Sequence, residues 1–165
     1  MVHFYFDTSA LIKRYHKENG SEAVDRIFDS EEEKGFVTSY WTVLEFMTAL
    51  ASKEKRKELS KRGLGVAIAN LVKDLNERFA IRSVNDELVA KALPLGVKYG
   101  PLGASDCLHL ATALELKQII EEAAGRLVFV SADEDLCKAV RKEKMEVINP
   151  RDNDALKQVE KLLVG

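Results

Sequence analysis

The sequence has few cysteines and no long apolar run. Two of its 165 residues are cysteines, Cys107 and Cys137, which lie 30 positions apart and form no CxxC pair. We therefore predict two free, buried thiols in an intracellular protein. No apolar run approaches the length of a membrane span, and the N-terminus lacks the apolar segment of a signal peptide. These absences predict a cytoplasmic protein that makes no membrane contact.

Positive charge is not in excess either, because 25 Lys and Arg face 27 Asp and Glu and the net charge is −2. Any nucleic-acid-binding surface must therefore be local. The sequence contains neither an internal repeat nor a low-complexity linker, and 165 residues are enough to bury a real core. We expect one domain over residues 1–165.

Short apolar runs alternate with stretches of helical periodicity. The expected strands are 2–6, 36–38, 80–84, 127–130 and 145–148. The expected helices follow residue 7, span 21–33, 40–56 and 64–79, open near 85, 104 and 133, and end the chain after 150. This alternation predicts an α/β fold with a parallel sheet covered by helices on both faces. In such sheets, ligands bind beyond the carboxyl ends of the strands.

Four carboxylates, Asp7, Glu45, Asp106 and Asp133, stand apart from other charges. Glu45 is the only formal charge from residue 36 to 52, where a chain with 32% charged residues would carry about five. Asp106 is the only one from 99 to 114 when His109 is counted as neutral. Asp7 and Asp133 each follow a predicted strand. A lone carboxylate in apolar surroundings costs free energy unless it is solvated, paired or metal-bound, so we predict that the four form one metal site.

Some of these acids also have a structural explanation. Asp7 suits a helix N-cap, but Thr8 or Ser9 can take that role and leave Asp7 free. Asp106 lies in the first turn of its helix, where the dipole favours an acid. His109, three residues later on the same face, fits a hydrogen-bonded interior histidine better than a metal ligand.

The segment Ser131-Ala132-Asp133-Glu134 reads as a capping box, with Ser131 as the cap and Glu134 at its third helical position. This interpretation leaves Asp133 without a structural role. Asp135 is a rival for the metal role, and the spacing does not separate the two acids.

Clustered carboxylates repel one another, and a divalent cation reverses that repulsion. Oxygen ligands without Cys or paired His favour Mg²⁺ or Mn²⁺ over Zn²⁺. Such an ion activates water and neutralises phosphate, which predicts phosphodiester hydrolysis. A haloacid-dehalogenase-type phosphatase also begins with an Asp after its first strand, but it needs a second Asp where this chain has Ser9.

Four motifs resemble those of PIN-domain ribonucleases, and most of all the VapC-type toxins of toxin–antitoxin pairs. They are Asp-Thr-Ser-Ala-Leu-Ile-Lys at 7–13, the internal Glu45, Ser-Asp-Cys-Leu-His-Leu-Ala-Thr-Ala at 105–113 and Ser-Ala-Asp-Glu-Asp-Leu at 131–136. The resemblance spans about residues 2–150 and leaves the helix from about 151 peripheral. It implies a three-layer sandwich with strand order 3-2-1-4-5. It also implies an acidic quartet of Asp7, Glu45, Asp106 and Asp133 around Mg²⁺ or Mn²⁺, lined by Ser9, and an antitoxin that covers the pocket.

A basic run fits an RNA partner. It sets six cations against Glu54 and Glu58, a net charge of +4, and consists of Lys53, Lys55, Arg56, Lys57, Lys61 and Arg62. The competing explanation is a solvated helix end. Apolar residues on the N-terminal helices and on 64–79 exceed the needs of one small core and predict a homodimer. We expect a metal-dependent endoribonuclease, with a non-catalytic PIN-like RNA-binding or protein-interaction module as the alternative.

Overall fold

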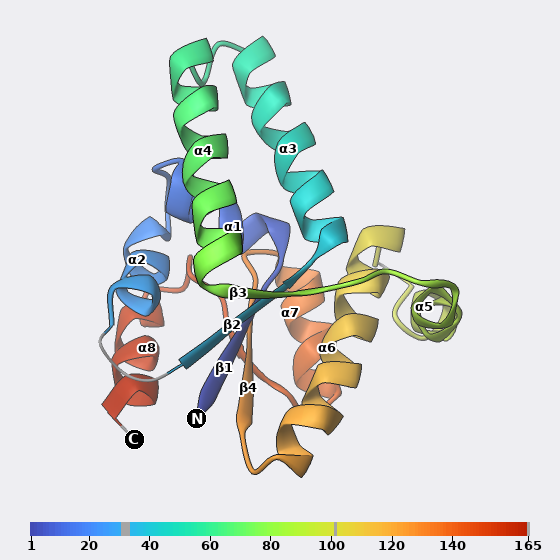
Figure 1. Ribbon diagram of the computed structural model, residues 1–165. Coiled ribbons are helices and arrows are strands. Elements are labelled where there is room, and N and C mark those ends of the chain that lie inside the picture. The colour runs from blue at the N-terminus through green and yellow to red at the C-terminus, as the bar shows by residue number, and fades with distance from the viewer. Residues whose placement is uncertain (31–33, 101, 165) are drawn as a thin grey trace.

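The strands form one parallel sheet, as the alternating pattern predicted. The computed structural model describes residues 1–30, 34–100 and 102–164. Within these ranges the five strands lie in the order β3-β2-β1-β4-β5, which confirms the expected order (Figure 1). Each neighbouring pair is parallel, and Phe4 of β1 lies opposite Phe36 of β2 and Val128 of β4. The strands are β1 (Val2–Phe6), β2 (Lys34–Ser39), β3 (Phe79–Arg82), β4 (Arg126–Val130) and β5 (Glu146–Ile148).

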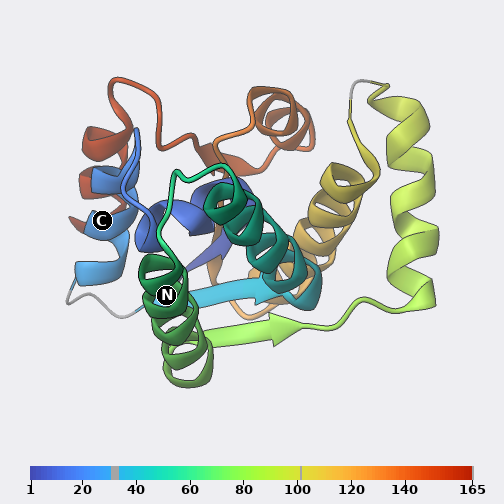
Figure 2. The ribbon, with the colours of Figure 1, turned by 90° about the horizontal axis from the view of Figure 1, so that it is seen from above.

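Helices cover both faces of the sheet, because alternate strand residues point to opposite sides. Phe4 and Phe6 pack into one core with α1 (Thr8–Tyr15), α2 (Ser21–Asp29), α3 (Tyr40–Lys55), α4 (Lys61–Glu77) and α8 (Ala155–Val164). Tyr5 packs into a second core with α5 (Asp86–Lys98), α6 (Ala104–Glu122) and α7 (Glu134–Lys142). Seen from above, α2 and α8 lie on one side of the molecule and α5 and α6 on the other (Figure 2). The expected three-layer α/β sandwich is therefore confirmed.

Most element boundaries agree with the sequence, and the differences have local causes. The helix expected over 64–79 begins at Lys61 because the Ser60 hydroxyl accepts a hydrogen bond from the Gly63 amide. Asn85 caps α5 as expected, and α5 continues through Pro94. The helix expected over 21–33 ends at Asp29, and residues 31–33 lie outside the described ranges.

Three further features bear on the sequence predictions. Cys107 and Cys137 are free and buried, as expected. The C-terminal helix α8 packs its buried Val159 into the same core as α2. No helix in the described ranges is both long and apolar enough to cross a membrane.

An aromatic cluster joins three strands of the sheet to helix α2. The ring of Phe6 lies 5.3 Å from that of Phe28, 5.7 Å from that of Phe36 and 6.0 Å from that of Phe79, measured between centroids. Phe6 is fully buried. Since Phe6 directly precedes Asp7, this packing also sets where the chain leaves the sheet.

We predict that Phe6→Ala lowers the free energy of unfolding by about 3–5 kcal/mol, because it removes a buried ring and leaves a cavity. Val66→Ala, at a side chain that is 53% exposed, should change it by less than about 0.5 kcal/mol. Urea unfolding followed by circular dichroism measures both values. A loss below about 1 kcal/mol for Phe6→Ala would contradict the packing described here.

Candidate active site

The carboxyl edge of the sheet carries a cavity of about 360 Å³ into which all four predicted acids open. Asp7 follows β1 and Asp133 follows β4, whereas α3 contributes Glu45 and α6 contributes Asp106. Asp135 lies outside this cavity, 56% exposed, with its carboxylate 2.8 Å from Lys138 Nζ. The complete lining is Asp7, Thr8, Ser9, Ile12, Glu18, Glu45, Ala49, Lys53, Asp106, His109, Asp133 and Arg151.

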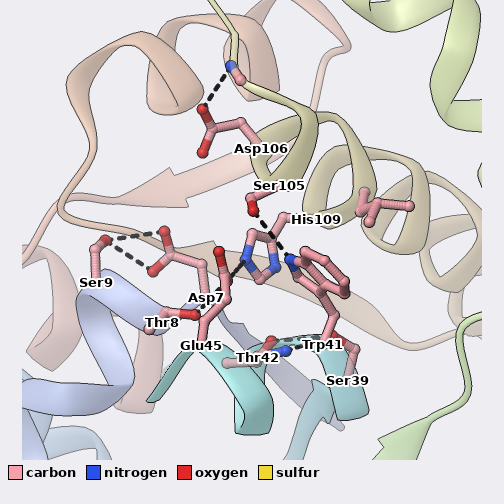
Figure 3. Close-up of polar contacts among 12 residues, drawn as sticks. Asp7, Thr8, Ser9, Ser39, Trp41, Thr42, Glu45, Ser105, Asp106 and His109 are labelled. Carbon is pink, nitrogen blue, oxygen red and sulfur yellow. Dashed lines mark hydrogen bonds and ion pairs between the residues drawn. The ribbon is translucent and has the colours of Figure 1, made fainter. Parts of the chain in front are cut away.

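Asp7 is buried and held by donors from two strand ends. Its Oδ1 accepts from the Ala10 amide at 2.9 Å, so Asp7 itself caps α1. The expectation that Thr8 or Ser9 would cap this helix is wrong, because their hydroxyls have other partners. Ser9 Oγ donates to Asp7 at 2.9 Å, and Ser131 Oγ donates to Asp7 Oδ2 at 2.6 Å (Figure 3 shows the Ser9 bonds). Burial raises the pKa of Asp7, and the positive charge of His109 and these hydrogen bonds only partly offset that effect.

Glu45 belongs to a chain of hydrogen bonds that also includes Thr8, His109 and Tyr5. Its Oε2 lies 2.8 Å from His109 Nε2 and accepts from Thr8 Oγ1 at 2.6 Å (Figure 3). His109 Nδ1 lies 3.0 Å from the Tyr5 hydroxyl. His109 is therefore the buried, hydrogen-bonded histidine that the sequence favoured.

The protonation of this chain differs from the neutral histidine assumed from the sequence. Burial alone would lower the pKa of His109, but Tyr5, Glu45 and Asp7 together raise it to about 10. Burial opposes ionisation of Glu45, but hydrogen bonds from His109, Thr8 and Ser105 bring its pKa down to about 2. Both shifts favour an imidazolium paired with a carboxylate, in which the charge of Glu45 is compensated.

Asp106 lies in the first turn of α6, and Asp133 is the N-cap residue of α7. Asp106 Oδ2 accepts from the Gly103 amide at 3.0 Å (Figure 3). Burial raises the pKa of Asp106; the bond from Gly103 lowers it, and the charge of Asp133 raises it further. Asp133 Oδ1 accepts from the Leu136 amide at 2.8 Å and caps α7. The predicted capping box with Ser131 as the cap is therefore wrong: the Ser131 hydroxyl donates to Asp7 and accepts from the Asp133 amide, which precedes the helix.

One contact outside the cavity holds two of its walls together. Trp41 Nε1 donates to Ser105 Oγ at 3.1 Å and joins the first turn of α3 to the first turn of α6 (Figure 3). These are the helices that carry Glu45 and Asp106. The contact therefore limits how far apart those two acids can move.

The donor set fits a hard divalent cation, because carboxylate and hydroxyl oxygens are the ligands that Mg²⁺ and Mn²⁺ prefer. Each carboxylate is, however, engaged by a protein donor. Among the residues that the structure describes, no three His, Cys, Asp or Glu side chains converge as a ready-made metal cluster. A bound metal would therefore compete with these donors for the carboxylate oxygens.

The predicted basic run only partly reaches the site. All six cations are described, and of these Lys53 alone lines the cavity. Lys53 Nζ lies 3.2 Å from Glu18 and 3.7 Å from Glu58, and Arg56 pairs with Glu58 at 2.7 Å. The others stand at the tip of the α3–α4 hairpin, which projects from the sheet in Figure 1. They are Lys55, Lys57, Lys61 and Arg62, and all four are exposed.

Sequence reasoning missed several cavity residues, among them Thr8, Glu18 and Arg151. Thr8 was overlooked because its partner Glu45 lies 37 residues away. Arg151 follows β5, so the rule that sites form beyond strand ends would have found it.

Comparisons with known proteins agree with this geometry. Residues 4–142 match the PIN domain family. A search of curated proteins finds no match. VapBC-1 from nontypeable Haemophilus influenzae is 15% identical with a TM-score of 0.58, covering 92% of this chain and 100% of that one. VapC20 of Mycobacterium tuberculosis, a sarcin–ricin loop cleaving toxin, is 16% identical with a TM-score of 0.60, covering 82% and 94%. FitAcB from Neisseria gonorrhoeae is 20% identical with a TM-score of 0.56, covering 89% and 97%. At these identities the likeness to solved structures is one of fold, whereas the family match spans most of the sequence; the chain belongs to the PIN domain family.

Proposed function

We propose that this protein is a metal-dependent endoribonuclease that hydrolyses RNA phosphodiester bonds. The observation that carries the proposal is that Asp7, Glu45, Asp106 and Asp133 all line one cavity in a PIN-domain chain. A complete set of four acids favours a nuclease over a non-catalytic binding module, because such a module has no need to bear the repulsion among them.

The chain's own residues have distinct parts in this proposal. A bound Mg²⁺ or Mn²⁺ would supply an activated water and neutralise charge on the phosphate. The hydroxyls of Ser9 and Ser131 keep Asp7 aimed into the cavity. Thr8 and His109 hold Glu45 ionised at its wall. No Ser or His is required as a nucleophile.

We also propose that the protein is the toxin of a toxin–antitoxin pair and acts on RNA in the cytoplasm. The fold shared with VapC20, VapBC-1 and FitAcB supports this role. In this proposal the antitoxin covers the acidic cavity and limits access to RNA. The exposed cations at the tip of the α3–α4 hairpin would contact phosphates that flank the cleavage site.

We also propose that the protein forms a homodimer. Along α5, Val89, Leu93 and Val97 are 42%, 69% and 88% exposed and recur every four residues, so they form one apolar stripe. An apolar groove beside this stripe, between α5 and the start of α6, has a volume of about 280 Å³. Exposed apolar surface of this kind is typical of an interface, and we assign it to a second copy of the chain. This surface differs from the one predicted from the sequence, because the apolar side chains of α1 and α2 and most of those on α4 pack into the core.

We expect Asp7→Asn to reduce RNA cleavage by more than about 100-fold while the protein stays folded. The asparagine oxygen can still accept from the Ala10 amide, but the residue loses the charge that would hold a metal. Asp135→Asn makes the same change outside the cavity and should leave the rate within about twofold. Cleavage of total cellular RNA in excess Mg²⁺, with the ends mapped by sequencing, measures both. Cleavage by Asp7→Asn at the parental rate would exclude the assigned role.

We expect the wild-type protein to be a dimer at micromolar concentration and Leu93→Glu to be a monomer, because the variant places a charge in the apolar stripe. Val66→Glu alters an apolar side chain on α4 that is 53% exposed, and it should remain dimeric. Light scattering coupled to size exclusion gives the masses. A monomeric wild type, or a Leu93→Glu variant that still forms a dimer, would rule out this interface.

A further inference from the structure

The turn after β5 brings a cation to the acidic cavity. β5 lies beside β4 in the sheet, and Arg151 follows β5 as Asp133 follows β4. Both side chains line the cavity that also holds Asp7. The ends of three adjacent parallel strands therefore supply two acids and one guanidinium to the same space.

The backbone of this turn is held firmly. The amide of Arg151 donates to Asn149 Oδ1 at 2.9 Å, and Asn149 is buried. The turn also packs against Gly20, whose φ is +92°. A Cβ at Gly20 would lie 2.7 Å from the carbonyl oxygen of Pro150, so this close approach requires glycine. Arg151 therefore extends from a fixed point at the rim of the cavity.

The charge balance of the cavity makes Arg151 available for an anion. Of the other basic side chains in the lining, Lys53 is committed to Glu18 and Glu58, and His109 is paired with Glu45. Within the described part of the chain, no hydrogen bond or ion pair engages the guanidinium of Arg151, which is exposed. An unpaired guanidinium beside a cavity lined with carboxylates suits a ligand whose phosphates meet metal on one side and arginine on the other.

We propose that Arg151 binds a backbone phosphate of RNA next to the phosphodiester that is cleaved. The inference rests on the proposed ribonuclease function and adds a substrate-binding residue to it. The match to the PIN family ends at residue 142, so Arg151 belongs to a part of the chain beyond the matched segment. Its planar guanidinium can donate two parallel hydrogen bonds to one phosphate. These bonds would fix the position of the RNA strand over the four carboxylates.

RNA binding tests this role in the cleavage-deficient Asp7→Asn background. The probe is a fluorescent single-stranded RNA of mixed sequence, titrated by anisotropy over a series of KCl concentrations. Arg151→Gln should weaken binding about tenfold and make the log–log salt slope shallower by about 0.7. Arg151→Lys should keep the salt slope of RNA binding but lose part of the affinity, since lysine retains the charge but lacks the paired donors of the guanidinium.

A matched control removes the same charge elsewhere. The control is Arg126→Gln. Arg126 is the first residue of β4, so it lies at the amino edge of the sheet, away from the cavity, and it pairs with Glu146. Its affinity and salt slope should equal those of the Asp7→Asn parent. The Mg²⁺-induced rise in melting temperature, measured with Asp7 intact, should be the same in Arg151→Gln as in wild type, because Arg151 acts on RNA and not on the ion.

The outcomes separate this inference from the proposed function. If the wild type cleaves RNA but Arg151→Gln binds with an unchanged slope, the role of Arg151 is overturned and the nuclease proposal stands. Arg151→Gln could instead lose the Mg²⁺-induced rise in melting temperature and keep the salt slope of RNA binding. Arg151 would then stabilise the acidic cavity rather than bind RNA, and the inference would also be overturned. A wild type that neither binds nor cleaves RNA would contradict both.

Discussion

Burial of the Asp7 carboxylate is the constraint on which the rest of this site depends. Asp7 caps α1 and receives hydroxyl hydrogen bonds from Ser9 and from Ser131, 124 residues away in sequence. It thereby ties the end of β1 to the end of β4. Because burial raises its pKa in the folded protein, keeping Asp7 ionised above its ordinary pKa costs folding free energy. Its three hydrogen-bond donors, Ala10, Ser9 and Ser131, offset part of that cost.

The other acids show the same combination of structural and chemical roles. Asp133 caps α7, Asp106 accepts from Gly103, and Glu45 is paired with the protonated His109. These bonds keep the carboxylates ordered at the cavity without a cation, since buried or clustered charge is tolerated only when hydrogen-bonded or paired. A metal ion would compete with local donors for Asp106 and Asp133, while the Glu45 pair stays largely compensated. The hydrogen bonds that order the carboxylates without metal would therefore weaken metal binding at this site.

The layered fold followed from the sequence because period-two and helical patterns are local, and the strand order came from the resemblance to PIN domains. The helix caps at Asp7 and Asp133 were predicted incorrectly for a physical reason. Asp, Ser and Thr all suit a cap, and the choice among neighbours depends on distant partners, such as Glu45 for the Thr8 hydroxyl. The salt bridge that commits Lys53 to Glu18 likewise forms only once α3 has packed against α1. Arg151 could have been predicted, because sites in parallel sheets form beyond the carboxyl ends of the strands.

The central claim is that the four acids at the carboxyl edge of the sheet form one divalent-cation site. Calorimetric titration of Mn²⁺ into the metal-free protein tests this most directly, because it requires neither an RNA substrate nor a partner. The wild type should bind Mn²⁺ saturably, and a variant with Asp7→Asn, Glu45→Gln, Asp106→Asn and Asp133→Asn should not. Equal binding by the two proteins, or no binding by the wild type, would contradict the account.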